Sequence, residues 1–120
     1  MLGLLLPLGA VSARAMFGGW GLYHEGTMFG LIEGERLYFK VDPESESDFL
    51  DKGCAAFTYR REGRRVALSY REAPAGALAS PEALRPWAER GLEAARRRAA
   101  AVRLRTNKRR VLGLPANKRQ

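Results

Sequence analysis

The sequence predicts an α+β fold, in which an antiparallel sheet of about five to six strands carries helices packed on one face. In the first part of the chain, short turns that combine glycine with a charged residue separate apolar runs of strand length. Two proline-marked helix starts follow, at residues 42–44 and 80–82, and the second opens a long helical stripe. At 120 residues, the chain is long enough for one domain with a proper core.

The most informative stretch is residues 14–23, which combine three glycines with three aromatic residues and a methionine. A helix disfavours so many glycines, at about 1 kcal/mol each relative to alanine, whereas a sharply bending strand favours them. We predict a strand that ends at Phe17, a kink or bulge at Gly18 and Gly19, and a second strand over residues 20–23. Later strands are expected to pair with this stretch and to pack against it.

Three further turns, at residues 24–26, 33–35 and 62–63, have the chemistry of hairpins because glycine supplies a positive φ. They predict strands over residues 20–24, 27–32 and 36–41, and a later hairpin of residues 56–61 and 64–70. In residues 36–41, Leu37, Phe39 and Val41 alternate with polar side chains, so one face is expected to be core and the other wet. Pro74 ends the pairing, because proline has no N–H to donate.

Two helices are predicted from their caps. Asp42 is a plausible N-cap for a short helix anchored by Phe49 and Leu50 and ended by Gly53. Ser80 caps a long helix whose apolar stripe runs from residue 84 to residue 102 and which is expected to fray near residues 106–107. One core between sheet and helices is expected to contain Met16, Phe17, Phe29, Leu37, Phe39, Phe57, Leu68, Leu84, Trp87 and Leu92.

The residues offer no catalytic constellation. His24, the only histidine, falls on a predicted turn, and Cys54 has no fixed basic neighbour that would activate a thiol. With one histidine and one cysteine, no ordinary zinc site is possible. The Gly-Gly-x-Gly of residues 18–21 precedes a predicted strand rather than a helix, which argues against a dinucleotide fingerprint. We therefore expect a protein that is not an enzyme and that uses no cofactor and no metal.

Two groups of residues allow a second interpretation. The acids at positions 44, 46, 48 and 51 are interpreted as a solvated helix face, which could also receive a basic partner surface or this chain's own basic end. The tyrosines at positions 23, 38, 59 and 70 are interpreted as core packing on a sheet, with base stacking of the RNA-binding type as the alternative.

Charge is concentrated at the C-terminal end. The net charge is +8, yet residues 96–120 contain ten Lys or Arg and no acid, which leaves 11 basic and 13 acidic residues elsewhere. The apolar residues 1–8 are too few to span a membrane and lack the positive start of a signal peptide. The single cysteine fits a reducing compartment, so we expect a cytoplasmic protein without a membrane partner.

The motif of residues 14–23, Arg-x-Met-Phe-Gly-Gly-x-Gly-x-Tyr, resembles the opening of the TfoX N-terminal domain, the first half of TfoX/Sxy competence regulators. The resemblance continues through residues 28–29, 37–40, 57–59, 69–74 and Trp87, and covers roughly residues 5–100. The family usually begins with a longer first helix, to which a short stub at residues 1–8 would correspond here. In place of the second, helical domain of the two-domain regulators, this chain has a basic tail. The residues that match the motifs, to which we assign structural roles, are Arg14, Met16, Phe17, Gly18, Gly19, Gly21, Tyr23, Phe29, Leu37, Tyr38, Lys40, Phe57, Tyr59, Tyr70, Pro74 and Trp87.

The resemblance implies a secretion-chaperone-like two-layer sandwich and a non-catalytic regulatory or adaptor domain. The resemblance further implies that such a domain would act by binding proteins, for instance transcription machinery, and would be linked to transcription of DNA-uptake genes. We expect a domain at residues 1–103, a basic tail at residues 104–120, and a homodimer formed through a sheet edge or the face near residues 4–8.

The alternative is a small nucleic-acid-binding protein that contacts phosphates without reading sequence. The residues expected to make those contacts are Arg96, Arg97, Arg98, Arg103, Arg105, Lys108, Arg109 and Arg110.

Overall fold

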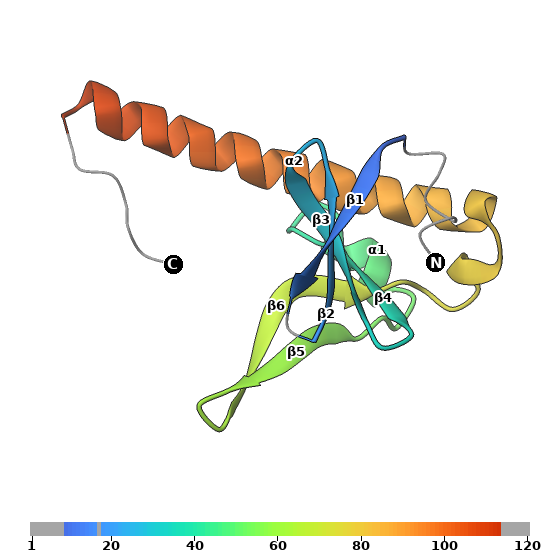
Figure 1. Ribbon diagram of the computed structural model, residues 1–120. Helices are drawn as coiled ribbons and strands as arrows, with labels where there is room; N and C mark the ends of the chain where they lie inside the picture. The colour runs from blue at the N-terminus through green and yellow to red at the C-terminus, as the bar shows by residue number, and fades with distance from the viewer. Residues whose placement is uncertain (1–8, 17, 114–120) are drawn as a thin grey trace.

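Six antiparallel strands form one sheet, and a helix of 31 residues crosses one of its faces (Figure 1). This computed structural model describes residues 9–16 and 18–113. The strands are β1 (Val11–Met16), β2 (Gly19–His24), β3 (Thr27–Glu33), β4 (Arg36–Lys40), β5 (Ala56–Arg61) and β6 (Arg64–Glu72). The helices are α1 (Glu46–Leu50), the 3-10 turn η2 (Ala77–Ala79) and α2 (Pro81–Val111). The sheet order is β1-β2-β3-β4-β6-β5, which confirms the predicted α+β class.

The glycine-rich stretch reverses the chain instead of kinking it. Met16 pairs with Gly19, so β1 and β2 are antiparallel strands joined by a tight turn in which Gly18 has a φ of +77°. The prediction of a bent strand was therefore wrong about the connection and right about the two strands. Phe17, predicted to end the first strand and to join the core, lies outside the described residues.

A bulge in β3 decides which side chains face α2. Leu22 pairs with Gly30 and Tyr23 pairs with Met28, so Phe29 is an extra residue in the ladder. Consequently Phe29 and the following Gly30 share the helix-facing side of the sheet, where a side chain at Gly30 would crowd Leu22 and Phe39. Met28 packs on the opposite side.

The main core lies between the sheet and the two helices. Ser80 begins α2 as predicted, because its Oγ accepts a hydrogen bond from the backbone N–H of Ala83 at 3.0 Å. Gly91 brings α2 close to the sheet, since a Cβ there would lie 3.0 Å from the carbonyl oxygen of Phe29. The buried residues of this core are Leu22, Phe29, Leu37, Phe39, Val41, Phe49, Cys54, Ala77, Leu84, Ala88, Leu92 and Ala95.

A second apolar cluster lies on the other face, which the sequence predicted to be wet. Leu31, Tyr38, Phe57 and Tyr70 are buried there, and Tyr38 is only 7% exposed. The cause is curvature: β6 pairs with β4 only at residues 70–72, and its remainder diverges with β5. Phe57 therefore packs edge-on against Tyr38, with ring centroids 5.1 Å apart. The expectation of a single core containing Phe57 and Leu68 was wrong.

The segment before α1 differs from the prediction in two ways. The Asp42 carboxylate accepts hydrogen bonds from the N–H groups of Glu44 and Ser45, both at 3.1 Å, so it caps a turn ahead of the helix. The regular helix begins only at Glu46. Phe49 is buried, whereas Leu50 is 52% exposed and anchors nothing, contrary to expectation.

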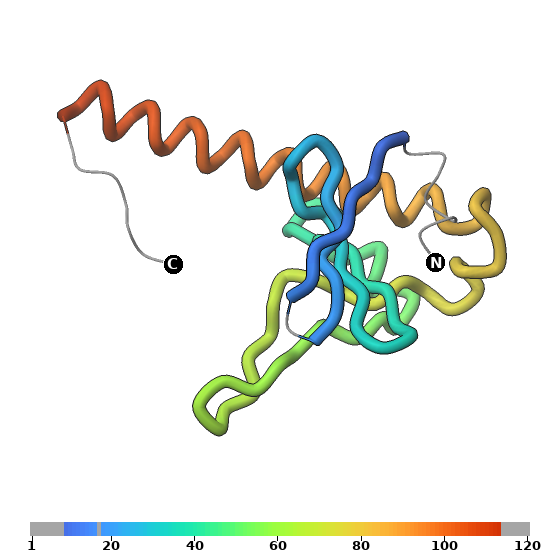
Figure 2. Tube along the Cα trace, in the orientation of Figure 1, coloured from blue at the N-terminus to red at the C-terminus, as the bar shows by residue number. Residues whose placement is uncertain are grey.

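The C-terminal half of α2 extends well beyond the sheet (Figures 1 and 2). The helix continues to Val111, so the expected fraying near residues 106–107 was wrong. Val102, which the sequence placed in the apolar stripe, is 41% exposed, because the stripe continues along α2 past the end of the sheet on which it packs. The proposed boundary between residues 103 and 104 falls inside this helix and stays a prediction.

Candidate functional site

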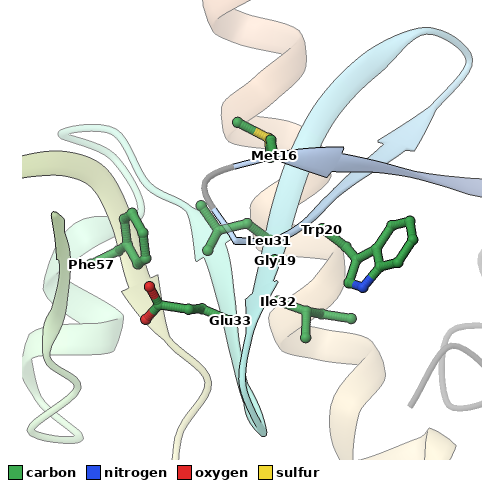
Figure 3. Close-up of a pocket in the computed structure, with 7 residues that line it drawn as sticks. All are labelled: Met16, Gly19, Trp20, Leu31, Ile32, Glu33 and Phe57. Atoms are coloured by element: carbon green, nitrogen blue, oxygen red, sulfur yellow. The ribbon is translucent and has the colours of Figure 1, made fainter.

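Gly19 and Gly21, which follow the glycine turn, are packed too tightly against their neighbours to leave room for a ligand. A Cβ at Gly19 would overlap the carbonyl oxygen of Ile32, and one at Gly21 would lie 2.6 Å from the Met16 sulfur. Gly19 opens a strand, which agrees with the rejection of a dinucleotide fingerprint. The pocket beside the turn is too narrow to admit a water molecule. Figure 3 shows that Trp20 and Ile32 point away from the Leu31 side of this pocket.

Most of the other residues that match the family motifs contribute to packing. Phe29, Leu37 and Trp87 belong to the main core, and Tyr38, Phe57, Tyr59 and Tyr70 to the second cluster. Pro74 is buried after the end of β6. The two cations stack on aromatic rings, Arg14 over Tyr23 at 5.0 Å and Lys40 over Tyr70 at 5.3 Å. Burial, reinforced by nearby Arg98, lowers the pKa of Lys40.

The Cys54 thiol is unsuited to nucleophilic catalysis. Burial raises the pKa of the Cys54 thiol, so the reactive thiolate is disfavoured. His24 lies in the β2–β3 hairpin, with Nδ1 3.8 Å from the Glu25 carboxylate, and only 13% of its side chain is exposed. Within the described ranges, no three His, Cys, Asp or Glu side chains come close enough to hold a metal ion.

Acidic side chains around α1 receive arginines from α2. Arg97 binds Asp42 at 2.6 Å and Glu44 at 3.1 Å, and Arg90 binds Asp48 at 2.9 Å. These pairs border an open groove of about 370 Å³ between the two helices. The idea that these acids receive this chain's own basic end is thus confirmed for Arg97. Contrary to what the position of the basic run predicted, Arg97 therefore does not project freely to solvent, and its contact with nucleic acid stays an untested prediction.

The remaining predicted phosphate contacts lie on one helix. We call residues 96–111 of α2 the basic arm; it contains no acid, and its outer part extends past the sheet. Arg109 is half-buried and has an interaction partner. The exposed cations of the arm are Arg96, Arg98, Arg103, Arg105, Lys108 and Arg110. The structure therefore brings together most of the residues that the sequence selected, with Arg97 directed elsewhere.

Sequence reasoning missed a second basic element, the hairpin tip, which we define as residues 60–65. Arg60 pairs with Arg65 across the two strands, and Arg61 pairs with Arg64. All four are exposed at the end of the hairpin, which projects from the sheet in Figure 1. The signal was present as Arg-Arg-Glu-Gly-Arg-Arg around a predicted turn, but the near-neutral charge of residues 1–95 concealed it.

The face of the sheet opposite α2 is the third candidate surface, here called the open face. Among residues 9–16 and 18–113, no helix packs on it. Four tyrosines gather there, and burial raises the pKa of Tyr70 to about 12. Apolar side chains at its surface remain half-buried, namely Met28, Tyr59 and Leu68. The open face therefore presents partly accessible apolar side chains at the border of a buried cluster.

No helix within residues 9–16 and 18–113 is both long enough and apolar enough to cross a membrane. Even α2 fails, because its exposed half is dominated by cations.

Comparison with known proteins agrees with the resemblance read from the motifs. The family model for the TfoX N-terminal domain matches residues 3–95. The DNA transformation protein TfoX1 of Aliivibrio fischeri is 35% identical over 63 residues, which are 52% of this chain. Those residues cover only 30% of that protein, so the chain spans about a third of the relative that it matches. The chain belongs to the TfoX N-terminal domain family, a regulatory rather than catalytic family related to competence regulators.

Proposed function

We propose that this chain is a non-catalytic adaptor that regulates transcription of DNA-uptake genes by binding a protein partner on the open face. Membership of a regulatory family supports the general role. The similarity to a protein named for DNA transformation supports the link to competence. Such a regulator would work in the bacterial cytoplasm, together with the transcription machinery.

One structural observation carries this proposal: the sheet is apolar on both faces, whereas α1 and α2 cover only one of them. An antiparallel sheet commonly leaves a polar face to water. Here Leu68 and Met28 border a buried cluster and remain partly accessible. Exposed apolar patches rimmed by polar groups mark protein interaction sites.

Leu68 and its neighbour Ala67 provide a matched test, because adjacent strand residues point to opposite faces. Leu68→Lys places a charge on the open face, and Ala67→Lys adds the same charge on the other side. Quantitative pull-downs after nuclease treatment should lose the partner with Leu68→Lys and keep it with Ala67→Lys. Urea unfolding confirms that both variants are folded. Equal retention of the same proteins by both variants would remove the open face as the binding surface.

A second candidate function is sequence-independent binding of nucleic acid by the basic arm, which a specific observation favours. The acid-free end of α2 extends into solvent, where its cations can approach a phosphate backbone. If about five cations engage duplex DNA, the log–log salt slope should be near −4.5. Fluorescence anisotropy should show this slope for the full chain and a weaker slope after truncation at Ala100.

Truncation after Ala100 is preferable to truncation after Ala95, because it retains the Arg97–Asp42 pair. Equal binding by the full and truncated chains would reject the arm as the contact.

We also propose a homodimer, formed through one of the sheet edges, β1 or β5, or through the face near residues 4–8, which lies outside the described residues. Light scattering across the micromolar range should give twice the mass of the chain; a monomer throughout would exclude this assembly.

A further inference from the structure

The hairpin tip places like charges directly opposite each other. Arg60 is the cross-strand partner of Arg65, and Arg61 is the partner of Arg64. Like charges at such positions destabilise a hairpin by mutual repulsion. The tip contains one acid, Glu62, which occupies the turn with a φ of +53°. Five of the six residues at the tip are charged, four of them positive and one negative, so the net charge of the tip is +3.

The arginines of the tip are not neutralised within the described part of the chain. Arg65 donates to the Thr58 hydroxyl at 2.7 Å, and Arg60 reaches the Gly63 carbonyl at 3.4 Å. The side chains of Arg61 and Arg64 make no hydrogen bond or ion pair among the described residues. Five arginines elsewhere in the body are matched to acids, in the pairs Arg36–Glu72, Arg71–Glu46, Arg85–Glu89, Arg90–Asp48 and Arg97–Asp42. Arg14 stacks on the Tyr23 ring instead.

We propose that the hairpin tip is a second phosphate-contacting arm, which binds duplex DNA together with the basic arm of α2. This inference rests on the second candidate function. A two-stranded β-ribbon is an element that the major groove of B-DNA admits. Side chains alternate along a strand, so Arg60 and Arg65 lie on one face of the ribbon and Arg61 and Arg64 on the other. Cations on both faces can meet the phosphates that border both sides of a groove.

Duplex DNA fits these observations better than an acidic protein does. The planar guanidinium group binds phosphate through two parallel hydrogen bonds, and the tip uses arginine at all four positions. In Figure 1, the hairpin tip extends to the lower left of the sheet and the end of α2 to the upper left, so the two are separate projections from the body. Two separate cationic arms suit an extended polyanion with regularly spaced charges, and phosphate contact would also relieve the repulsion between the paired arginines.

The test compares two double variants with equal charge loss. The variant R61Q/R64Q removes the two arginines whose side chains form no ion pair or hydrogen bond within the described residues. The variant R36Q/R85Q removes two exposed arginines that form ion pairs with Glu72 and Glu89. Binding of a random-sequence duplex is followed by fluorescence anisotropy between roughly 50 and 200 mM salt. For R61Q/R64Q, we expect the salt slope to become shallower by about 1.8 and affinity at 100 mM salt to fall roughly 60-fold. The control should change the slope by much less.

Each other outcome overturns the proposal in a recognisable way. An unchanged slope for R61Q/R64Q, with a reduced slope after truncation at Ala100, rejects the tip and preserves the arm. Equal changes of salt slope and affinity in both double variants would show that only the net charge of the protein matters, and would reject the tip as a specific contact. If polyglutamate of equal charge concentration competes as well as DNA, the tip instead serves an acidic protein. No binding of the full chain at low salt rejects the tip and the second candidate function together.

Discussion

The guanidinium of Arg97 donates to both carboxylate oxygens of Asp42, from Nε to Oδ2 at 2.6 Å and from Nη2 to Oδ1 at 3.0 Å. This contact joins α2 to the turn that precedes α1, across 55 residues of sequence. Asp42 is largely buried, with 18% of its side chain exposed, and Arg97 is 37% exposed. The hydrogen bonds from Arg97, which outweigh the opposing effect of burial, lower the pKa of Asp42 to about 2.

Asp42→Asn should destabilise the protein at neutral pH and alter its acid response. Because the folded-state pKa is depressed below the ordinary 3.8, the contribution is fully present above pH 4. It is lost as the pH falls towards 2. We expect a loss on the order of 1–2 kcal/mol, less than the full shift implies, because water screens the partly exposed Arg97. Urea unfolding at pH 7, 4 and 2.5 measures the difference.

Asp51→Asn is the control, because Asp51 is exposed and forms no ion pair within the described residues. An Asp42→Asn variant as stable as the parent at pH 7 would show that this pair contributes nothing to stability.

Gly19→Ala and Gly18→Ala should separate a steric cost from a conformational one. A Cβ at Gly19 would collide with the Ile32 carbonyl, so we expect a loss of about 3 kcal/mol or more. Gly18 faces open space but has a φ of +77°, so alanine there should cost about 1–2 kcal/mol. Thermal unfolding of both variants gives the comparison. A fully stable Gly19→Ala protein that had lost a binding activity would show that the turn is a site.

The strands and the start of α2 could be predicted because their signals are local. The turns at residues 25–26, 34–35 and 62–63 and the Ser80 cap depend on neighbouring residues alone. The interpretation of Tyr38 and Tyr70 as core packing is confirmed by their burial. Their place in a separate cluster on the second face could not be predicted, because the alternation in β4 looks the same whether Tyr38 meets water or Phe57. Burial of Tyr38 depends on where β6 leaves β4, which is a long-range property.

In the candidate site too, features that depend on neighbouring residues could be predicted, whereas features that depend on folding could not. The sequence identified the cations of the basic arm, since their density is visible in one run. It misplaced Arg97, because the Asp42 carboxylate that binds it is brought near only by folding. The length of α2 was underestimated because the apolar stripe ends before the helix does. Helix propensity, which arginine, leucine and lysine support, continues beyond the last packing contact.

Phe49 and Leu50 are neighbours with opposite surroundings, so their alanine variants should differ strongly. Phe49 is fully buried and packs edge-on against Trp87 at 5.0 Å, so Phe49→Ala should cost about 3–5 kcal/mol. Leu50 is 52% exposed, and Leu50→Ala should change stability by less than about 0.5 kcal/mol. Urea titration of both variants tests this. Similar losses would place Leu50 in the core, as the sequence alone suggested.

The Cys54 thiol should react slowly with alkylating reagents in the folded protein. It is 8% exposed, and burial raises its pKa, so little thiolate forms at neutral pH. Iodoacetamide labelling at pH 7.5, followed by mass spectrometry, should proceed far more slowly in buffer than in 6–8 M urea, in which the thiol is fully exposed. Equal rates would mean that Cys54 is accessible and activated in the native state.

Leu104→Pro should break the basic arm without unfolding the body. Proline removes a backbone hydrogen bond and clashes with the preceding turn, at a cost of about 3 kcal/mol within a helix. Leu104 is 69% exposed, and no residue from 101 to 108 is buried. The cost therefore falls on the exposed end of the helix, whose unwinding costs the core no contacts. We expect a weaker helical signal in far-UV circular dichroism and an almost unchanged urea midpoint. Leu92→Pro, placed where α2 is buried against the sheet, should instead unfold the domain. A large fall in the urea midpoint with Leu104→Pro would mean that the arm packs against the body after all.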